Sequence, residues 1–305
     1  MRFSAIHLLR LKGLRMAIFF QFVDYLIRYC AKLTTNLEDC LLTNMNLDLK
    51  GKRALVCGST QGIGKASALE LAQLGASITL VARNEDKLKG VIAELAVEQM
   101  QRHEYLVADF DVPEKLKNII QGYAAKNNIH ILINNTGGPP AGLAIDAAPE
   151  EFIKAFNSHL INGQILVQAL VPGMKQEKYG RIINIISTSV KIPVRGLGVS
   201  NTIRGAVANW SKTLATELAP FGITVNNILP GTTMTGRLEA IIQNNANKAG
   251  TTFEEAKKKM IEEVPAGRIS EAYEVAAAVA FLASPAANYI TGINLPVDGG
   301  RTGSL

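Results

Sequence analysis

The chain has 305 residues, 48% of them hydrophobic and 19% charged, which is typical of a folded globular protein with a large core. The formal net charge is +6, but residues 1–44 carry six Lys or Arg against three Asp or Glu, so half of this excess lies there. The remaining charge is too small to indicate a nucleic-acid-binding protein. The three cysteines (Cys30, Cys40 and Cys57) and the four scattered histidines have no disulfide or metal-ligand spacing. We therefore expect no metal and a reducing, cytoplasmic location.

The first 44 residues do not share the pattern of the rest of the chain. An apolar run at 16–23 is followed by Asp24 and Arg28, so it is too short and too charged to cross a bilayer. No small-residue cleavage site follows it, as a secretory signal would require. We expect residues 1–44 to be an extension outside the fold, with translation beginning at Met45 and the folded domain at 45–305. An amphipathic surface anchor and a targeting segment are the alternatives.

A short apolar strand is predicted at 54–56, directly before a glycine-rich stretch that runs from Cys57 to Gly64 and leads into helix-forming residues. Strand, glycine turn and helix in this order is the setting in which such a motif binds a dinucleotide. Gly58 permits a tight turn. Gly62 and Gly64 allow a phosphate to approach the main chain at the start of the helix, where free N–H groups and the helix dipole favour an anion. A glycine-rich connection without a function is the alternative.

From residue 52 onward, apolar runs alternate with helical stretches. The strands are expected at 54–56, 77–81, 105–108, 129–133, 181–186, 223–229 and 293–297. The helices are expected at 63–74, 84–98, 113–127, 149–174, 200–219 and 271–282. Almost continuously apolar strands separated by helices predict an α/β fold, a single Rossmann-type doubly wound parallel sheet of about seven strands with helices on both faces. Ligands bind such sheets at the carboxyl ends of the strands, where the strand order reverses.

One polar segment interrupts this alternation. It runs from Thr232 to about Val264, is rich in Thr, Asn, Gly and Lys, and follows the strand expected at 223–229. Long polar insertions at the carboxyl edge of a sheet often cover a ligand. We expect a lid, and the alternative is a mobile surface helix without a function.

Six short blocks stand in order along the chain. They are residues 57–64, Ala108-Asp109, Asn134-Asn135-Thr136-Gly137, residues 180–187, residues 226–231, and Ile290-Thr291-Gly292 leading to Val297-Asp298-Gly299-Gly300. Each is weak alone, but in this order and spacing they resemble the short-chain dehydrogenase/reductase family, in particular its 3-oxoacyl-(acyl-carrier-protein) reductase type. The resemblance covers residues 47–300 and implies a nicotinamide-dependent oxidoreductase.

The resemblance also implies which residues bind the cofactor. They are Gly58, Ser59, Gln61, Gly62, Ile63 and Gly64 in the pyrophosphate loop, Asp109 at the adenine, Asn135 and Gly137 at the adenosine ribose, and Pro230, Gly231, Thr233 and Thr235 at the nicotinamide carboxamide and a nearby phosphate.

Arg83, at the end of the second strand, indicates which nicotinamide cofactor is used. An acidic residue there binds the ribose 2′-hydroxyl of NAD, whereas an arginine accommodates the 2′-phosphate of NADP, whose oxygens match the guanidinium fork. We therefore expect NADP(H), and a solvated arginine is the alternative.

The catalytic positions depart from the family pattern. The family set is Asn, Ser, Tyr and Lys, and the resemblance places these at His159, Ser187, Ser200 and Arg204, so only the serine is retained. An aliphatic hydroxyl is a much weaker acid than a phenol, and Ser200 is too short to reach the carbonyl except through water. Arg204 lies one turn from Ser200, so it can bind the ribose and supply positive potential, but guanidinium does not shuttle protons.

His159 offers another route for the proton, because imidazole titrates near neutral pH. Our hypothesis is that His159 delivers the proton through water while Ser187 and Arg204 stabilise the developing oxyanion. The alternative is a helix histidine bonded to a neighbouring carbonyl. Tyr179 precedes a strand and should lie at the far end of the sheet, so we do not expect it to replace the missing tyrosine.

The expected function is NADP(H)-dependent hydride transfer between nicotinamide and the carbonyl or secondary alcohol of a small molecule, with a 3-oxoacyl thioester as one substrate class. A catalytically impaired NADP-binding sensor or structural protein is the alternative, and a reduction that needs no strong acid is a third reading. Members of the family commonly assemble through two long helices, here 149–174 and 200–219. We therefore expect a homodimer or homotetramer, with Ala206, Val207 and Ala208 allowing close helix packing, and neither a nucleic-acid partner nor a membrane span.

Overall fold

Seven parallel strands form one sheet in the order β3-β2-β1-β4-β5-β6-β7. The computed structural model describes residues 45–304, so the expectations for residues 1–44 lie outside the described residues. The strands are β1 (Arg53–Cys57), β2 (Ser77–Ala82), β3 (Glu104–Val107), β4 (Ile131–Asn134), β5 (Gly180–Ile185), β6 (Ile223–Pro230) and β7 (Asn294–Val297). The expected fold class and the parallel sheet are confirmed, with each strand within two residues of its predicted bounds.

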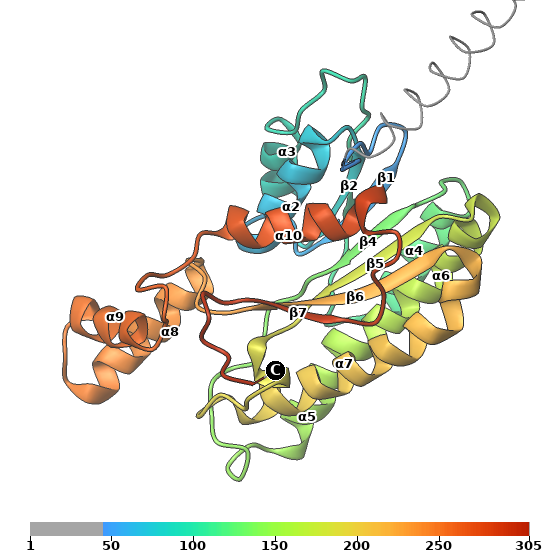
Figure 1. Cartoon of the computed structure of the whole chain (residues 1–305). Helices are drawn as coiled ribbons and strands as arrows, with labels where there is room; N and C mark the ends of the chain where they lie inside the picture. Colours follow the sequence, from blue (N-terminus) through green and yellow to red (C-terminus); the bar gives the residue numbers. More distant parts are fainter. Residues whose placement is uncertain (1–44, 305) are drawn as a thin grey trace, which may run out of the picture. The chain divides into compact units, whose positions relative to one another are not determined.

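Helices connect the strands and cover both faces of the sheet (Figure 1). They are α2 (Gly62–Gln73), α3 (Glu85–Ile92), α4 (Pro113–Ala124), α5 (Pro149–Phe156), α6 (Asn162–Glu177), α7 (Gly198–Leu218), α8 (Gly236–Ala249), α9 (Phe253–Glu262) and α10 (Ala272–Ala283). The predicted helix at 149–174 is divided into α5 and α6 by a π-helical turn, Asn157–Ile161.

Alternate strand residues build two separate cores, one on each face. Val56 packs among buried residues of α2, α3 and α10, whereas its neighbours Leu55 and Cys57 pack among buried residues of α4, α6 and α7. Because successive side chains of a strand point to opposite faces, a strand covered on both sides must be apolar throughout. This explains the unbroken apolar runs in the sequence.

The predicted helix at 84–98 is too long, because α3 ends at Ile92. The chain then makes tight turns, in which the N–H groups of Glu94 and Leu95 donate to the carbonyls of Val91 and Ile92. Leu95 is buried in the core shared with α2, and Glu94 forms an ion pair of 2.7 Å with Lys65. Burial of Leu95 in the core favours the turn here over continued helix.

The order in which strands are added to the sheet changes direction between β1 and β4, which are adjacent parallel strands. β2 and β3 continue to one side of β1, and β5, β6 and β7 continue to the other. The carboxyl ends of β1 and β4 therefore open a crevice at the edge where ligands bind in doubly wound sheets. From Leu47 onward the chain forms one compact unit around this sheet.

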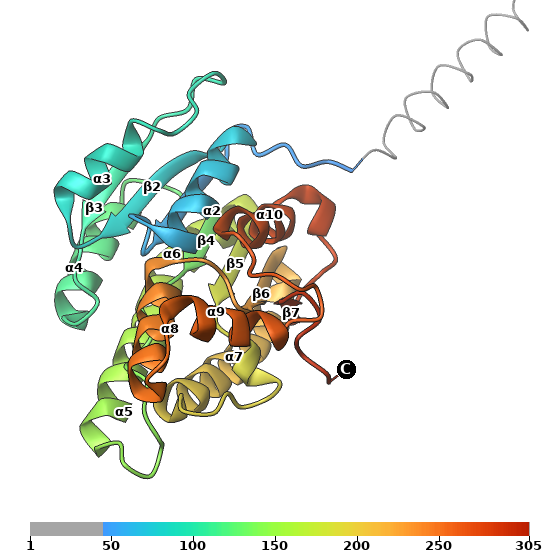
Figure 2. The same cartoon turned by 90° about the vertical axis from the view of Figure 1, so that its left-hand side faces the viewer.

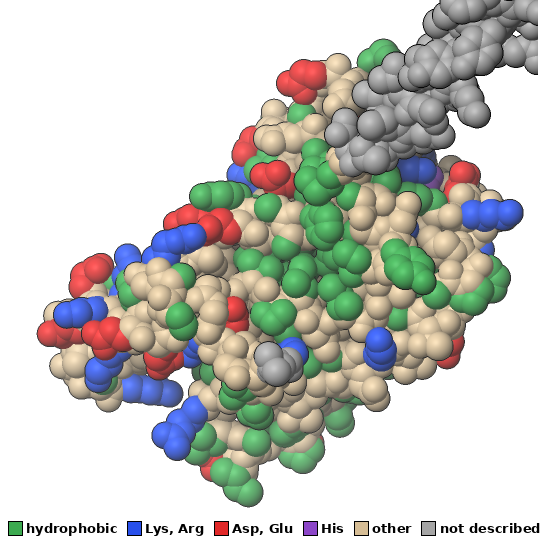
Figure 3. Space-filling model, in the orientation of Figure 1, with side chains coloured by type: hydrophobic (Ala, Val, Ile, Leu, Met, Phe, Trp, Pro, Cys, Tyr) green, Lys and Arg blue, Asp and Glu red, His purple; other side chains and the backbone are tan. Residues whose placement is uncertain are grey.

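The polar segment after β6 folds as two helices, α8 and α9, which lie beyond the carboxyl end of β6 (Figures 1 and 2). They share a small core of their own, made of Ile242, Ala246 and Ala256 with partly buried neighbours. Charged side chains of both signs gather over them (Figure 3). Within residues 45–304, no helix is both long enough and apolar enough to cross a membrane.

Candidate active site

A cleft of about 900 Å³ opens at the carboxyl edge of the sheet and brings the predicted site residues together. Every predicted cofactor and catalytic residue except Ser59 and Gly64 lines it. The lining predicted residues are Gly58, Gln61, Gly62, Ile63, Arg83, Asp109, Asn135, Gly137, His159, Ser187, Ser200, Arg204, Pro230, Gly231, Thr233 and Thr235. Most of them follow the carboxyl ends of β1 to β6, and His159, Ser200 and Arg204 come from the π-helical turn and from α7, which explains how residues far apart in sequence meet.

Ser59 and Gly64 belong to the glycine-rich loop but do not line the cleft, so their expected part in cofactor binding stays a prediction. Ser59 is fully buried, and its Oγ donates to the carbonyl of Val81 at 3.4 Å. A Cβ on Gly64 would lie 2.2 Å from the carbonyl oxygen of Gly58, and therefore no side chain fits there. The absence of a side chain at this position lets the start of α2 pack against the loop.

The start of α2 is well suited to an anion. Gln61 is its N-cap residue but makes no side-chain capping bond, and no acidic residue stands in the first turn. The side chain of Asn135 donates to the carbonyls of Cys57 and Gly58 at 3.3 Å, which fixes the loop against the end of β4. The N–H groups at this helix start are thus left for a ligand phosphate, so the residues present fit a dinucleotide.

Two basic side chains line the cleft where β2 ends. Arg83 follows β2, and Lys87 lies one turn later in α3. Asn84 caps this helix by accepting from the N–H of Lys87 at 2.9 Å. Sequence reasoning identified Arg83 but missed Lys87, although a helix start at residue 84 already places the two residues near each other.

The opposite end of the cleft holds the predicted catalytic side chains. Ser187 Oγ accepts from the N–H of Ser189 at 3.1 Å, which leaves its own proton free to donate. Ser200 is buried in α7, and within residues 45–304 its hydroxyl makes no hydrogen bond. Arg204 is buried too, and its Nη1 donates to the carbonyl of Ile185 at 2.8 Å. Burial, with a smaller contribution from the charge of Arg237, lowers the pKa of Arg204 to about 10.

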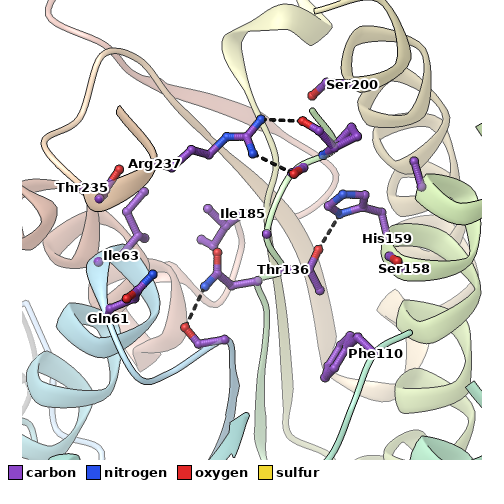
Figure 4. Close-up of a pocket in the computed structure, with 18 of the residues that line it drawn as sticks. Gln61, Ile63, Phe110, Thr136, Ser158, His159, Ile185, Ser200, Thr235 and Arg237 are labelled. Atoms are coloured by element: carbon purple, nitrogen blue, oxygen red, sulfur yellow. Dashed lines mark hydrogen bonds between the residues drawn. The ribbon is translucent and has the colours of Figure 1, made fainter. Parts of the chain in front are cut away.

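His159 lies in the π-helical turn between α5 and α6, and its side chain is 8% exposed. Its Nδ1 is 2.5 Å from the hydroxyl of Thr136 (Figure 4). Burial, followed by the charges of Arg204 and Arg237, lowers the pKa of the imidazole from 6.5 to about 2. The expectation that it titrates near neutral pH is therefore wrong, because desolvation and two nearby cations disfavour the imidazolium. The alternative partner, a carbonyl, is also wrong, because the partner is a hydroxyl.

Tyr179 lies at the opposite edge of the sheet from this site, as predicted. Its hydroxyl donates to the carbonyl of Ala283 at 2.9 Å, and its ring packs against the charged groups of Lys52 and Arg181. It is a packing residue and does not replace the missing tyrosine.

Arg237 was not predicted and lines the same end of the cleft. It stands in the first turn of α8, and its Nη1 and Nη2 donate to the carbonyls of Gly138 and Pro139 at 2.7 and 2.9 Å (Figure 4). The segment of α8 and α9 is thus tied across the cleft to the loop after β4, as a lid would be. The polar composition of the segment led to the expectation of a lid, but nothing in the sequence indicates which of its side chains faces the cleft.

Comparisons with known proteins agree with this architecture. The family model described as enoyl-(acyl carrier protein) reductase matches residues 58–302. The chain is 35% identical to the 3-oxoacyl-(acyl-carrier-protein) reductase FabG of Haemophilus influenzae, over 83% of this chain and 98% of that protein. It is 30% identical to the NADPH-dependent reductase BacG of Bacillus subtilis, over 83% of this chain and 99% of that protein.

A solved structure with the same fold is that of L-sorbose reductase from Gluconobacter frateurii, complexed with NADPH and L-sorbose. It superimposes with a TM-score of 0.80 at 30% identity, covering 86% of this chain and 100% of that chain. The extent of the family match and of these relatives confirms the resemblance. The chain belongs to the short-chain dehydrogenase/reductase family.

Proposed function

We propose that this protein is an NADP(H)-dependent oxidoreductase that acts on the carbonyl or secondary alcohol of a small molecule. The observation that carries the proposal is the continuity of one cleft, which runs from the start of α2 and Arg83 to Ser187 and Arg204. One end suits a phosphorylated dinucleotide and the other suits a carbonyl oxygen. The relatives named as NADPH-dependent reductases, and the sorbose reductase structure with NADPH, support the same cofactor and reaction.

The residues that would hold the cofactor follow from the geometry. The N–H groups at the start of α2 would bind its diphosphate, and Arg83 with Lys87 would bind the 2′-phosphate. Thr233 and Thr235, which line the cleft just before α8, would bind near the nicotinamide. When bound, NADPH supplies the hydride.

The residues at the reaction end would stabilise charge on the substrate oxygen. Ser187 can donate its free hydroxyl proton in a hydrogen bond, and the guanidinium of Arg204 supplies a fixed positive charge. Because the imidazole of His159 stays neutral, it would not store a proton. It would instead relay one from water: Nε2 would accept the proton as Nδ1 donates to the hydroxyl of Thr136, and that hydroxyl would pass its own proton on into the cleft.

The test begins with a fluorescence titration of the protein with NADPH. It continues with a screen of ketones, oxo acids and 3-oxoacyl thioesters, in which oxidation is followed by the loss of NADPH absorbance. We expect tight binding of NADPH and turnover of at least one class. Tight binding without oxidation across the whole panel would instead indicate a sensor or structural protein. The thioesters belong in the panel because FabG is among the relatives.

We also propose that the protein is a cytoplasmic homodimer or homotetramer, that residues 1–44 are an extension, and that 45–305 is the folded domain. Assembly through α6 and α7 cannot use Val207 and Ala208, because both are buried within this chain, at 3% and 6% exposure. Of the three residues expected at the interface, only Ala206 is partly exposed and able to contact a partner subunit. Light scattering after size-exclusion chromatography tests the assembly, and a monomer would contradict it.

A further inference from the structure

The reaction end of the cleft holds two guanidinium groups without a carboxylate partner. Among residues 45–304, the ion pairs within 4.0 Å do not include Arg204 or Arg237. Both donate to main-chain carbonyls instead. Main-chain carbonyls are neutral, so two positive charges remain uncompensated in a partly desolvated site.

The acidic side chains that line the cleft already have partners. Asp111 forms an ion pair with Lys154 at 3.5 Å, and Glu151 accepts from the N–H of Ala148 at the start of α5. Asp109 accepts from the N–H of Asp111. Within residues 45–304, none of the three forms an ion pair within 4.0 Å with Arg204 or Arg237.

The uncompensated positive charge includes Arg204, which lies at the reaction end of the cleft. It is 8% exposed, its Nε is buried without a partner, and its Nη2 makes no hydrogen bond with another described residue. It borders the cleft together with Ser187 and Ser200. A buried cation with unused donors beside these hydroxyls favours a ligand that brings negative charge to this end.

Arg237 is placed to bind such a group directly. Figure 4 shows its side chain directed away from Gln61 and Ile63, where the diphosphate would lie, and toward the side of Ser200 and His159. Its two terminal nitrogens already hold two neighbouring oxygens at 2.7 and 2.9 Å, which is the fork arrangement that a carboxylate accepts. A substrate carboxylate could therefore take the place of the carbonyls of Gly138 and Pro139 as the hydrogen-bond acceptor of Arg237.

From these observations we propose that the substrate carries a carboxylate near its reacting carbonyl, as in a 2- or 3-oxo acid or the matching hydroxy acid, and that Arg237 binds this carboxylate. The proposal rests on the proposed function and narrows its substrate class. Of the classes considered above, it selects small oxo acids over neutral ketones and 3-oxoacyl thioesters.

The test compares 2- and 3-oxo acids with their methyl esters as substrates of the wild-type protein and of Arg237→Gln, Arg237→Lys and Lys248→Gln. Lys248 is the matched control, because it is an exposed cation on the same helix and does not line the cleft. We expect the wild type and Lys248→Gln to favour the acid over its ester by about tenfold or more in kcat/KM, as a charge-assisted contact would. Arg237→Gln should abolish this preference, and Arg237→Lys should retain part of it. Equal use of acid and ester by the wild type, or an equal loss for both in Arg237→Gln, would overturn the proposal.

A binding measurement separates this proposal from the proposed function. Oxamate, a small analogue of a 2-oxo acid that NADPH does not reduce, is titrated calorimetrically into each variant saturated with NADPH, after NADPH affinity has been shown to be unchanged. If no substrate in the panel turns over, the proposed function fails, and oxamate then decides the inference. Binding to the wild type that is lost in Arg237→Gln supports it, and no binding to the wild type overturns it. Turnover of neutral ketones alone leaves the proposed function standing and overturns the inference.

Discussion

Nδ1 of His159 shares a hydrogen bond of 2.5 Å with the hydroxyl of Thr136, which joins the π-helical turn after α5 to the loop after β4. The bond fixes the ring at the reaction end, and burial next to two arginines keeps it uncharged. A neutral, positioned imidazole can accept and donate hydrogen bonds at neutral pH but does not carry an extra proton.

The lowered pKa of His159 predicts a particular dependence of stability on pH. The unfolded chain binds a proton below about pH 6.5, whereas the folded protein does not until about pH 2, so stability from this group is present above pH 6.5 and is lost as the pH falls. By pH 5 the wild type should lose about 2 kcal/mol more unfolding free energy than His159→Asn, at about 1.4 kcal/mol per pH unit. Urea denaturation of both proteins between pH 8 and pH 5 measures this difference. Parallel curves would show that the imidazole is not held neutral.

Ser200 occupies the position of the family's acid but should not act as one. We expect Ser200→Ala to reduce kcat by less than about tenfold, because loss of a true general acid reduces rates by about 10²–10⁴-fold. Ser187→Ala should reduce kcat by about 10²-fold, as loss of an oxyanion donor does. Steady-state kinetics of both variants with one substrate test the assignment. A larger loss in Ser200→Ala than in Ser187→Ala would reverse the two roles.

Arg83 and Lys87 should determine the choice of NADP(H) over NAD(H). Loss of one charge-assisted contact to the 2′-phosphate should weaken NADPH binding by about 10–100-fold in Arg83→Ser and in Lys87→Ala, and leave NADH binding nearly unchanged. Fluorescence titration measures both affinities. Lys89→Gln is the control, because Lys89 pairs with Glu85 at 2.9 Å and does not line the cleft. An equal loss of affinity for NADPH and for NADH would mean that these cations do not contact the 2′-phosphate.

Gly138 should be required for the contact that ties the lid to the loop after β4. A Cβ there would lie 2.8 Å from the guanidinium carbon of Arg237, so Gly138→Ala must displace the arginine from its two carbonyls. We expect faster amide hydrogen exchange in α8 and a loss of about 1 kcal/mol in its local stability. Gly142→Ala is the control, because a Cβ at that position meets nothing within 4 Å. Equal exchange in the two variants would show that Arg237 does not hold the lid.

Much of the fold could be predicted because its signals are local. The strand β1, the glycine-rich turn and the start of α2 adjoin in sequence, and the apolar strands required a sheet covered on both faces. The end of α3 could not be predicted, because Leu95 joins a core formed by residues distant in sequence. The cleft lining could not be predicted for a similar reason: a motif shows which residues form a loop, but not that Ser59 and Gly64 lie outside the cleft that the loop borders.

The sequence by itself determined the parallel α/β sheet, which follows from residue type and spacing along the chain. Its resemblance to the family implied the glycine-rich cofactor loop and the replacement of the family's tyrosine and lysine by Ser200 and Arg204, and Arg83 led to the prediction of NADP(H). Only the tertiary structure decided that His159 is neutral and that Arg237 reaches the loop after β4, because both depend on burial and on charges brought close by segments far apart in sequence. The pKa of a side chain and the pairing of a cation depend on neighbouring groups, and these neighbours come together only when the chain folds.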